Sequence, residues 1–339
     1  MHLPASLARL NFVSFAHTKA ACRALAYVAL IVGASGAIAA SNSVPSRFEL
    51  LRAQDLRVAS VAYRLAIANK ALCAPVLVPQ LGFVLHSFEQ YGPADREEAA
   101  RSFGLGSHIG VMAIVAGSPA ERAGLAAGDQ LLSVNGRNLD AQPEESAPSR
   151  ASVEHAQRIL VEEMRRGAVT LLISSPGGDR ELRFAAALGC PSNVELVPGD
   201  EVNAWADGSR VILSDGLLRR CATDDDLALV IGHEMAHNLL HHRRRLAAEG
   251  VSVNGLLALT EVESAEVRGT EEEADRFAVN LAMAAAYDLS DAETFIGALM
   301  RDGTTAATTH PDLPRRLALL HGAIVAAKQG IALAPRLSE

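Results

Sequence analysis

The sequence predicts an α+β fold, in which a mainly helical domain with a small β-sheet is joined to a smaller domain of short strands and two helices. The chain has 339 residues, of which 49% are hydrophobic and 21% charged, enough for two domains with separate cores. Aromatic residues make up only 4% and alanine is plentiful, which favours helix packing. Short apolar runs separated by turn dipeptides occupy the middle of the chain, and helical periodicity dominates the last third.

The charge pattern argues against a nucleic-acid partner. The formal net charge is -8, and no stripe of basic residues interleaved with aromatic residues is present. A groove for a phosphate backbone needs such a stripe. We therefore expect no nucleic acid among the partners.

The N-terminus has the pattern of a secretory signal. Lys19 and Arg23 precede an apolar run over 24–40, which ends in the small residues Ala37-Ile38-Ala39-Ala40-Ser41. The run is shorter than the roughly 20 residues of a membrane-spanning helix. We predict a cleaved signal peptide at 1–40 and export to the periplasm or cell envelope. An uncleaved anchor and a buried core helix are the alternatives.

Export would place the remaining cysteines in an oxidising compartment. These are Cys73, Cys190 and Cys221, which allow one disulfide and one free thiol. We favour the pair Cys73–Cys190, because it would join the segments on either side of the central module. Three buried thiols are the alternative.

The segment 41–102 is expected to be helical and to pack on the last domain. Apolar residues recur at helical spacing over 46–73, and Pro75 and Pro79 then interrupt the pattern. A second, short helix is expected over 83–91, ended by Gly92-Pro93.

The segment 103–188 is predicted to be a separate domain. Turn signals separate its strands, and the dipeptide Asn135-Gly136 is a strong hairpin signal. An amphipathic helix is expected over 152–166. The expected strands are 109–115, 130–134, 169–174 and 181–184, with a short helix between Gly117 and Gly124.

This segment resembles a bacterial PDZ domain. The resemblance rests on four motifs, which are Gly117-Ser118-Pro119-Ala120, Ala123-Gly124-Leu125, Gly128-Asp129 and Val134-Asn135-Gly136. PDZ domains bind an extended peptide end by adding it to a sheet edge. The resemblance makes Phe103-Gly104-Leu105-Gly106 the candidate carboxylate-binding loop. A PDZ domain that only packs against its neighbour is the alternative.

A candidate metal site lies on a predicted helix that begins after Thr223. The acidic residues Asp224-Asp225-Asp226 suit the first turn of a helix. His233 and His237 are four residues apart, so both imidazoles can reach one ion from the same helix face. Glu234 is rotated by about 100° from His233. Its carboxylate is thus placed beside the ion as a base and not as a ligand.

A third ligand is expected from a second helix. Thr270 and Glu273 have the spacing of a capping box, which predicts a helix start at this point. Glu271 can complete a His/His/Glu set, which leaves one open position on a catalytic zinc ion. Asp275, one turn later, can accept a hydrogen bond from a ligand imidazole. Solvated histidines, and a Glu271 that only complements the helix dipole, are the alternatives.

Within the last domain, 189–339, residues 190–320 resemble the HtpX-like zinc metallopeptidases, a gluzincin family that includes CAAX prenyl proteases and soluble periplasmic members. The resemblance implies one zinc ion per chain bound by His233, His237 and Glu271, with Glu234 as the general base. It also implies that Asn203-Ala204-Trp205 is the edge strand lining the substrate cleft. Its motifs are Asn203-Ala204-Trp205, Gly216-Leu217-Leu218, His233 to Asn238, Glu271 to Asp275, and His310-Pro311 with Arg316.

Three further histidines lie near these motifs. The family context puts His310 near the metal, where it would gate the site or contact substrate; a turn before a helix is the alternative. His241 and His242 are expected to be solvated, beside Arg243-Arg244-Arg245, with a role as alternative metal ligands as the other interpretation. The apolar run 251–259 is too short to cross a bilayer.

Together these features predict a zinc-dependent metalloendopeptidase that cleaves proteins or peptides, with misfolded envelope proteins as the expected substrates. Peripheral association with the membrane or with envelope complexes is compatible with this location. A gated or weakly active chaperone of the cell envelope is the main alternative. A zinc hydrolase of non-peptide amides is a third interpretation.

Overall fold

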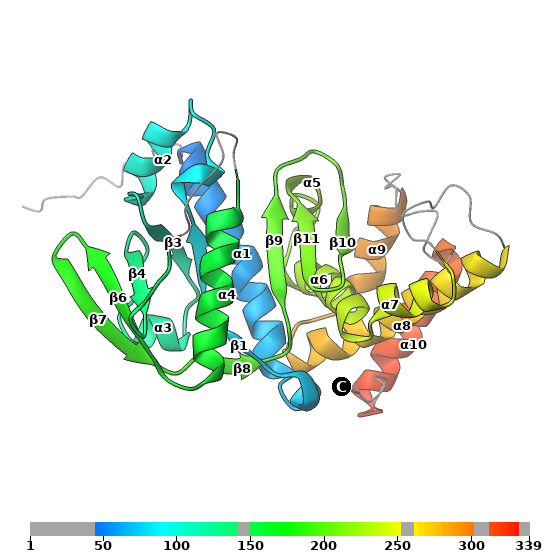
Figure 1. The fold of residues 1–339 in the computed structure, drawn as a ribbon. Helices are drawn as coiled ribbons and strands as arrows, with labels where there is room; N and C mark the ends of the chain where they lie inside the picture. Colours follow the sequence, from blue (N-terminus) through cyan, green and yellow to red (C-terminus); the bar gives the residue numbers. More distant parts are fainter. Residues whose placement is uncertain (1–44, 141–148, 252–260, 302–311, 332–339) are drawn as a thin grey trace, which may run out of the picture. The chain divides into compact units, whose positions relative to one another are not determined.

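The computed structural model describes residues 45–140, 149–251, 261–301 and 312–331 (Figure 1). The signal peptide expected at 1–40 and the residue His310 lie outside the described residues. In the described part of the chain, no helix combines the length and hydropathy that crossing a membrane requires.

The first helix, α1 (Arg47–Ala68), begins at a capping box, in which Ser46 and Glu49 satisfy each other's backbone N–H groups. Its residues Val58, Val61 and Leu65 are buried in the same core as the later helices. The helix is thus the expected long one, ending a few residues before the predicted limit.

The first sheet has the strand order β2-β3-β4-β6-β7, with β5 paired to β4, and all its pairings are antiparallel. The helix expected over 83–91 is wrong, because β2 occupies its first half and a 3₁₀ turn follows at Phe88–Gln90. Phe83 and Leu85 alternate with Val84, which suits a strand beside a core. The strands are β2 (Phe83–His86), β3 (Ile109–Ile114), β4 (Gln130–Val134), β5 (Arg137–Asn138), β6 (Val169–Ser175) and β7 (Gly178–Phe184).

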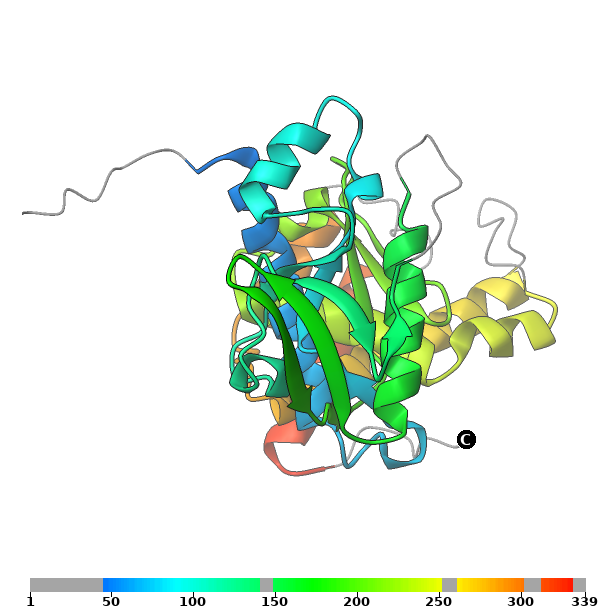
Figure 2. The ribbon, with the colours of Figure 1, turned by 60° about the vertical axis from the view of Figure 1, so that its left-hand side comes forward.

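Helices α2 (Arg96–Phe103), α3 (Pro119–Arg122) and α4 (Ala151–Arg165) accompany this sheet (Figure 2). One face of α4, with Val153, Ala156, Leu160 and Met164, packs into the core under the strands. The opposite face is polar. The amphipathic helix expected at 152–166 is therefore present.

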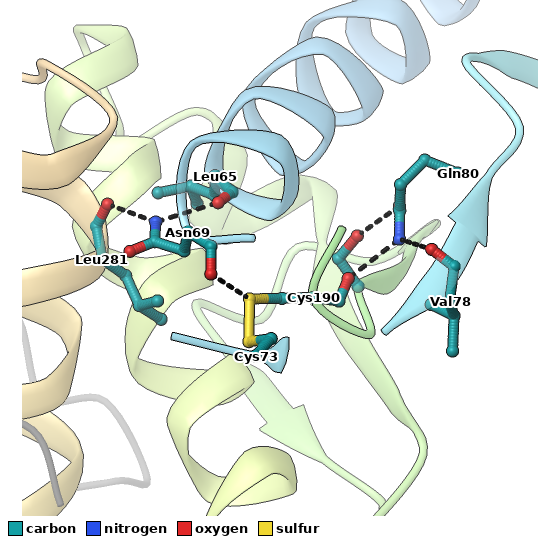
Figure 3. The surroundings of a disulfide bond; sticks show 8 residues. Leu65, Asn69, Cys73, Val78, Gln80, Cys190 and Leu281 are labelled. Carbon is teal, nitrogen blue, oxygen red and sulfur yellow. Dashed lines mark hydrogen bonds between the residues drawn. A yellow bond between two sulfur atoms is a disulfide. The ribbon is translucent and has the colours of Figure 1, made fainter. Parts of the chain in front are cut away.

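A disulfide between Cys73 and Cys190, the favoured pair, joins the segment after α1 to the start of the last domain (Figure 3). Nearby, the Asn69 side-chain amide donates hydrogen bonds to the carbonyls of Leu65 and Leu281. The amide of Gln80 donates to the Cys190 carbonyl. Cys221 is buried and free. The short antiparallel pair β1 (Val78–Gln80) and β8 (Ala187–Gly189) lies beside the disulfide, after a 3₁₀ turn at Ala74–Val76.

The second sheet has the strand order β10-β11-β9. Strand β9 runs parallel to β11, and β10 runs antiparallel to it. Both outer strands are thus edge strands, on opposite sides of β11. The strands are β9 (Asn193–Val197), β10 (Ala204–Ala206) and β11 (Arg210–Ser214).

Helices α6 and α8 form the centre of the last domain, where Gly232 of α6 faces the backbone of Ala278 on α8. Helix α8 begins well before Thr270, so the capping box expected there is wrong. The Thr270 hydroxyl instead donates to the carbonyl of Val267, within the helix. The helices are α5 (Asp215–Leu218), α6 (Asp224–Leu239), α7 (His242–Ala248), α8 (Glu261–Ala284), α9 (Ala292–Arg301) and α10 (Leu313–Lys328).

The domain limits 41–102, 103–188 and 189–339 stay predictions. Strand β2 lies in the first segment but pairs with β3 in the second. Helix α1 also lies in the first segment but is buried in the core of the third. The first segment is therefore shared between both neighbours.

Candidate metal centre

Helix α6 holds the candidate ligands His233 and His237. Its start is fixed by a capping box, in which the Thr223 N–H donates to Asp226 and the Asp226 N–H donates to the Thr223 hydroxyl. His233 is buried, His237 is half-buried, and both rings lie on one face of the helix.

Helix α8 brings Glu271 to these histidines. The two Nε2 atoms are 3.1 Å apart. The nearest Glu271 oxygens lie 3.2 Å from the Nε2 of His233 and 3.5 Å from that of His237. Atoms that bind a tetrahedral zinc ion at 2.0–2.1 Å lie about 3.3 Å from one another. The three side chains therefore fit a zinc ion in both donor type and spacing.

Asp275 contacts the Nδ1 side of the His233 ring. The His233 Nδ1 lies 2.9 Å from the Asp275 carboxylate, which fixes the tautomer that leaves Nε2 for a metal. Arg316 of α10 donates two hydrogen bonds to the same carboxylate, at 2.8 and 2.9 Å. Burial raises the pKa of Asp275, but Arg316 and His233 lower that pKa by more. Asp275 is thus a charged, fully buried hydrogen-bond acceptor.

The pKa of His233 is raised, although burial by itself lowers it. The hydrogen bonds to Asp275 and Glu271 and their charges outweigh burial. Without a metal, the cluster therefore favours a proton on His233. A metal must displace this proton, because imidazole binds metals in its neutral form.

His242 supports His237 in the same way, so the expectation that His242 is solvated is wrong. His241 has a left-handed backbone with φ of 54°, which separates α7 from α6 and turns His242 back toward the site. His242 is only 1% exposed, and its Nδ1 lies 3.0 Å from the Nδ1 of His237. Its Nε2 lies 3.1 Å from Glu273, which Arg245 also contacts.

The protonation of His242 follows from its surroundings. Burial and the neighbouring His237 lower the pKa of His242 to about 4, so the ring is neutral near pH 7. Its Nε2–H donates to Glu273, and its Nδ1 accepts from the Nδ1–H of His237. This pattern leaves the Nε2 of His237 for the metal.

Glu234 and strand β10 border the open side of the cluster. A cavity of about 70 Å³ there is lined by His233, Glu234, Asn203 and Ala204, together with apolar residues of α9 and α10. The next residue, Trp205, is 42% exposed on the edge strand. The residues expected to line a substrate cleft are thus beside the residue expected to act as a base.

Asn238, directly after His237, links α6 to the turn between β10 and β11 and to the start of β11. Its side-chain amide donates to the Arg210 carbonyl at 2.9 Å, and its oxygen accepts from the Gly208 N–H at 2.8 Å. The position of the edge strand is therefore coupled to that of the ligand helix.

The structure does not support Phe103–Gly106 as a carboxylate-binding loop. The N–H groups of Gly104 and Leu105 both donate to the Ala100 carbonyl and end α2. Phe103 is buried against Phe48. Neither these donors nor the ring is available to a peptide end.

The roles of two residues at the site were not predicted from the sequence, although Arg316 was named there as part of a family motif. Arg316 is buried on α10 together with Leu320 and Ile324, so an arginine in the apolar stripe of a helix was a usable signal. His242 had no such signal, since its position depends on the left-handed conformation of His241.

Two family models match parts of the chain. Residues 180–265 and 251–324 match the sequence model of peptidase family M48, and residues 110–173 match that of the PDZ domain. The search of curated proteins finds no match. Among solved structures, an HtrA-type protease, AlgW with decapeptide, aligns at 23% identity and a TM-score of 0.23. That alignment covers 33% of this chain and 30% of the other.

Proposed function

Because the chain carries a domain of peptidase family M48 and a PDZ domain, we propose that it is a zinc-dependent endopeptidase that cleaves proteins or peptides. The convergence of His233, His237 and Glu271 carries this proposal. A His/His/Glu set with one open side is the arrangement of a catalytic zinc site rather than a structural one.

Each residue of the site has a defined role in this reaction. When bound, zinc lowers the pKa of a water molecule and polarises the scissile carbonyl. Glu234 accepts the proton of the attacking water and returns it to the leaving amine. Asp275 and His242 hold the two ligand imidazoles in the correct tautomers.

The substrate is proposed to lie extended along β10. This strand is an edge of its sheet, so it can pair with an added strand. Asn203 and Ala204 line the cavity beside Glu234, which supports cleavage at this point. Asn238 then keeps the bound chain in register with the ligand helix.

Zinc content and digestion of casein, measured on the same variants, test the proposal. Glu271→Ala is expected to lose zinc and activity together. Glu234→Gln is expected to keep zinc and to lose turnover, because only the base is removed. Digestion of casein by zinc-loaded Glu234→Gln at the wild-type rate would exclude the proposed mechanism.

We further propose that the protein acts outside the cytoplasm, in the periplasm or cell envelope, in the removal of misfolded proteins. The apolar segment at 24–40 and the Cys73–Cys190 disulfide support this location. Cell fractionation with sequencing of the mature N-terminus tests it. A cytoplasmic protein that begins before residue 24 would contradict it.

A gated or weakly active chaperone is the second candidate. The small cavity beside Glu234 favours it, since about 70 Å³ is well below the roughly 300–1000 Å³ of open ligand sites. Glu234→Gln separates the two functions. A chaperone would keep its suppression of aggregation in this variant, whereas a peptidase would lose its turnover.

A further inference from the structure

The turn that joins β10 to β11, residues 207–209, is fixed by its first residue, Asp207. One carboxylate oxygen of Asp207 accepts hydrogen bonds from the N–H groups of Ser209 and Arg210, at 2.9 and 2.7 Å. The other oxygen accepts from the Nε of Arg210, at 2.8 Å. Burial raises the pKa of Asp207, but these hydrogen bonds lower it by more, to about 2. The carboxylate is therefore charged, and it holds Arg210, the first residue of β11, against the turn.

The guanidinium of Arg210 also reaches two carboxylates outside the turn. Its Nη1 lies 3.3 Å from Glu195 on β9 and 3.4 Å from Glu154 on α4. Arg150, directly before α4, lies 2.5 Å from the same Glu195. The four side chains thus alternate in charge, and two of them belong to the start of α4. Because α4 lies in the segment that matches the PDZ domain, this network joins that domain to the second sheet.

The buried position of Glu195 requires its arginine partners. Its side chain is only 7% exposed, and a carboxylate left unpaired in such a position is strongly destabilising. Glu154 and Arg210 pair nearer the surface, at 43% and 38% exposure, where ion pairs add little to stability. We therefore expect the contact between Arg210 and α4 to fix the position of the turn more than to stabilise the fold.

The backbone of Arg210 contacts the helix that carries the candidate ligands. Its carbonyl accepts from the Asn238 amide at 2.9 Å, and the Asn238 oxygen accepts from the Gly208 N–H at 2.8 Å. Asn238 directly follows His237 on α6. Arg210 therefore contacts α4 through its guanidinium and α6 through its carbonyl. One residue links the PDZ domain to the candidate metal centre.

Strand β10 depends on this link because it is short. It has three residues, and the last of them, Ala206, pairs with Val211, the neighbour of Arg210. Ala204, which lines the cavity beside Glu234, is two residues away, about 7 Å along the strand. A shift of the turn is therefore passed on to the cavity, since few residues lie between them to absorb it.

From these contacts we propose that Arg210 is a positioning residue for cleavage, which holds β10 against α6 by anchoring the turn of residues 207–209 to α4. The proposal rests on the proposed peptidase function, since β10 is the strand along which the substrate is proposed to lie. It makes the PDZ domain a part of the framework of the cleavage site. A domain that only captured substrates would leave the cleavage of a short, end-blocked peptide independent of Arg210.

Cleavage of such a peptide by the full, zinc-loaded chain tests the proposal. The probe is a short quenched fluorogenic peptide, copied from a site that the wild type cleaves in casein. Its C-terminus is amidated, so that it offers the PDZ domain no free carboxylate. Arg210→Met is expected to lower kcat/KM about tenfold, mainly through KM, because a displaced β10 binds the substrate less well. The zinc affinity should be unchanged, because the ligands stay in place.

Three further variants separate positioning from a general loss of structure. Arg210→Lys keeps a charge for Glu195 but loses the fork of the guanidinium, so its KM should lie between those of the wild type and Arg210→Met. Asn238→Ala releases the turn from α6 instead of from α4. Combined with Arg210→Met, it should add little to the loss in kcat/KM, because the turn is held only while both links are intact. Arg137→Met is the matched control. Arg137 pairs with Glu162 of α4 at 2.7 Å and is 46% exposed, but this pair joins two elements of the PDZ domain, so KM should not change.

Trp205 provides a measurement that does not depend on activity. It is the single tryptophan of the chain, and it lies on β10 with 42% of its surface exposed. If Arg210 holds this strand, acrylamide quenching of the tryptophan emission should rise in Arg210→Met. It should stay at the wild-type value in Arg137→Met. The measurement is made on zinc-loaded and metal-free protein alike.

The outcomes separate this proposal from the proposed function. A wild-type KM for the peptide, or unchanged quenching, in Arg210→Met overturns the role of Arg210, even if casein is digested more slowly. Equal losses in Arg210→Met and Arg137→Met overturn it too, as do losses that multiply in the double variant. Failure of the wild type to bind zinc or to digest casein overturns the peptidase function instead. The quenching of Trp205 then decides alone whether Arg210 holds β10.

Discussion

The Nδ1 of His242 lies 3.0 Å from the Nδ1 of His237, so a third imidazole stands directly behind a candidate zinc ligand. Its other nitrogen contacts Glu273 of α8. His233 is held by Asp275, one half-turn further along the same helix. Helix α8 therefore supplies one ligand, Glu271, and the carboxylates that orient both histidines. The geometry of the centre depends on the packing of α6 against α8.

His242→Ala is expected to weaken zinc binding about 10- to 100-fold, the usual effect of removing a residue that orients a ligand. The reason is that His237 loses the acceptor for its Nδ1–H. Competition with a chelator measures the affinity. His241→Asn is the control, because asparagine tolerates the left-handed backbone at 241 and its neighbour keeps the contact. Equal zinc affinities in the two variants would contradict the role of His242.

Arg316→Met is expected to lower the free energy of unfolding by about 3–5 kcal/mol, because it leaves the Asp275 carboxylate buried without its main partner. Arg315→Met provides the comparison. Arg315 is exposed and pairs with Glu272, so its loss should change stability by less than about 1 kcal/mol. Urea unfolding of the metal-free proteins measures both. Similar values for the two variants would refute a structural role for the buried pair.

The parts of the fold predicted from the sequence are those set by local rules. The cap at Thr223 fixes the start of α6, and its helical period then places His233 and His237 on one face. Strand β4 and its hairpin at Asn135-Gly136 are also local features, and the structure has them at the predicted residues. Glu271 could be predicted as the third ligand because Asp275 lies one turn later on the same face of the helix.

The errors occur where distant residues override a local pattern. Phe83 lies in a strand because β3, more than 20 residues later, provides its pairing edge. Thr270 has the spacing of a cap, yet the helix continues through it, because Val267 before it packs against Leu246 and the residues after it pack in the main core. His242 is buried because a single left-handed residue turns it inward. None of these effects is visible in a short window of sequence.

Replacing both Cys73 and Cys190 by alanine is expected to destabilise the protein by about 2–5 kcal/mol, since the disulfide spans 117 residues and restricts the unfolded chain. Cys221→Ala removes a buried thiol without opening the disulfide and serves as the comparison. Urea unfolding with and without a reductant measures the difference. The reductant should lower the stability of the wild type and of Cys221→Ala, and should leave the double variant unchanged.

The stability of the protein should depend on pH through Asp55. Burial raises the folded-state pKa of this carboxyl from 3.8 to about 7, while Arg150 lowers it and Asp215 and Glu195 raise it further. A raised folded-state pKa means that the folded protein holds the proton more tightly than the unfolded chain. This contribution to stability is complete below pH 3.8 and is lost as the pH rises through about 7.

Asp55→Asn removes this loss, because the amide does not ionise. The variant should therefore match the wild type near pH 4 and exceed its free energy of unfolding by a growing margin up to about pH 7, with a constant margin above. Asp55→Glu keeps an ionisable carboxyl and should show no such gain. Urea unfolding across this pH range measures all three proteins. A margin that is the same at every pH would mean that the folded and the unfolded chain hold the Asp55 proton equally tightly, and would contradict a raised folded-state pKa.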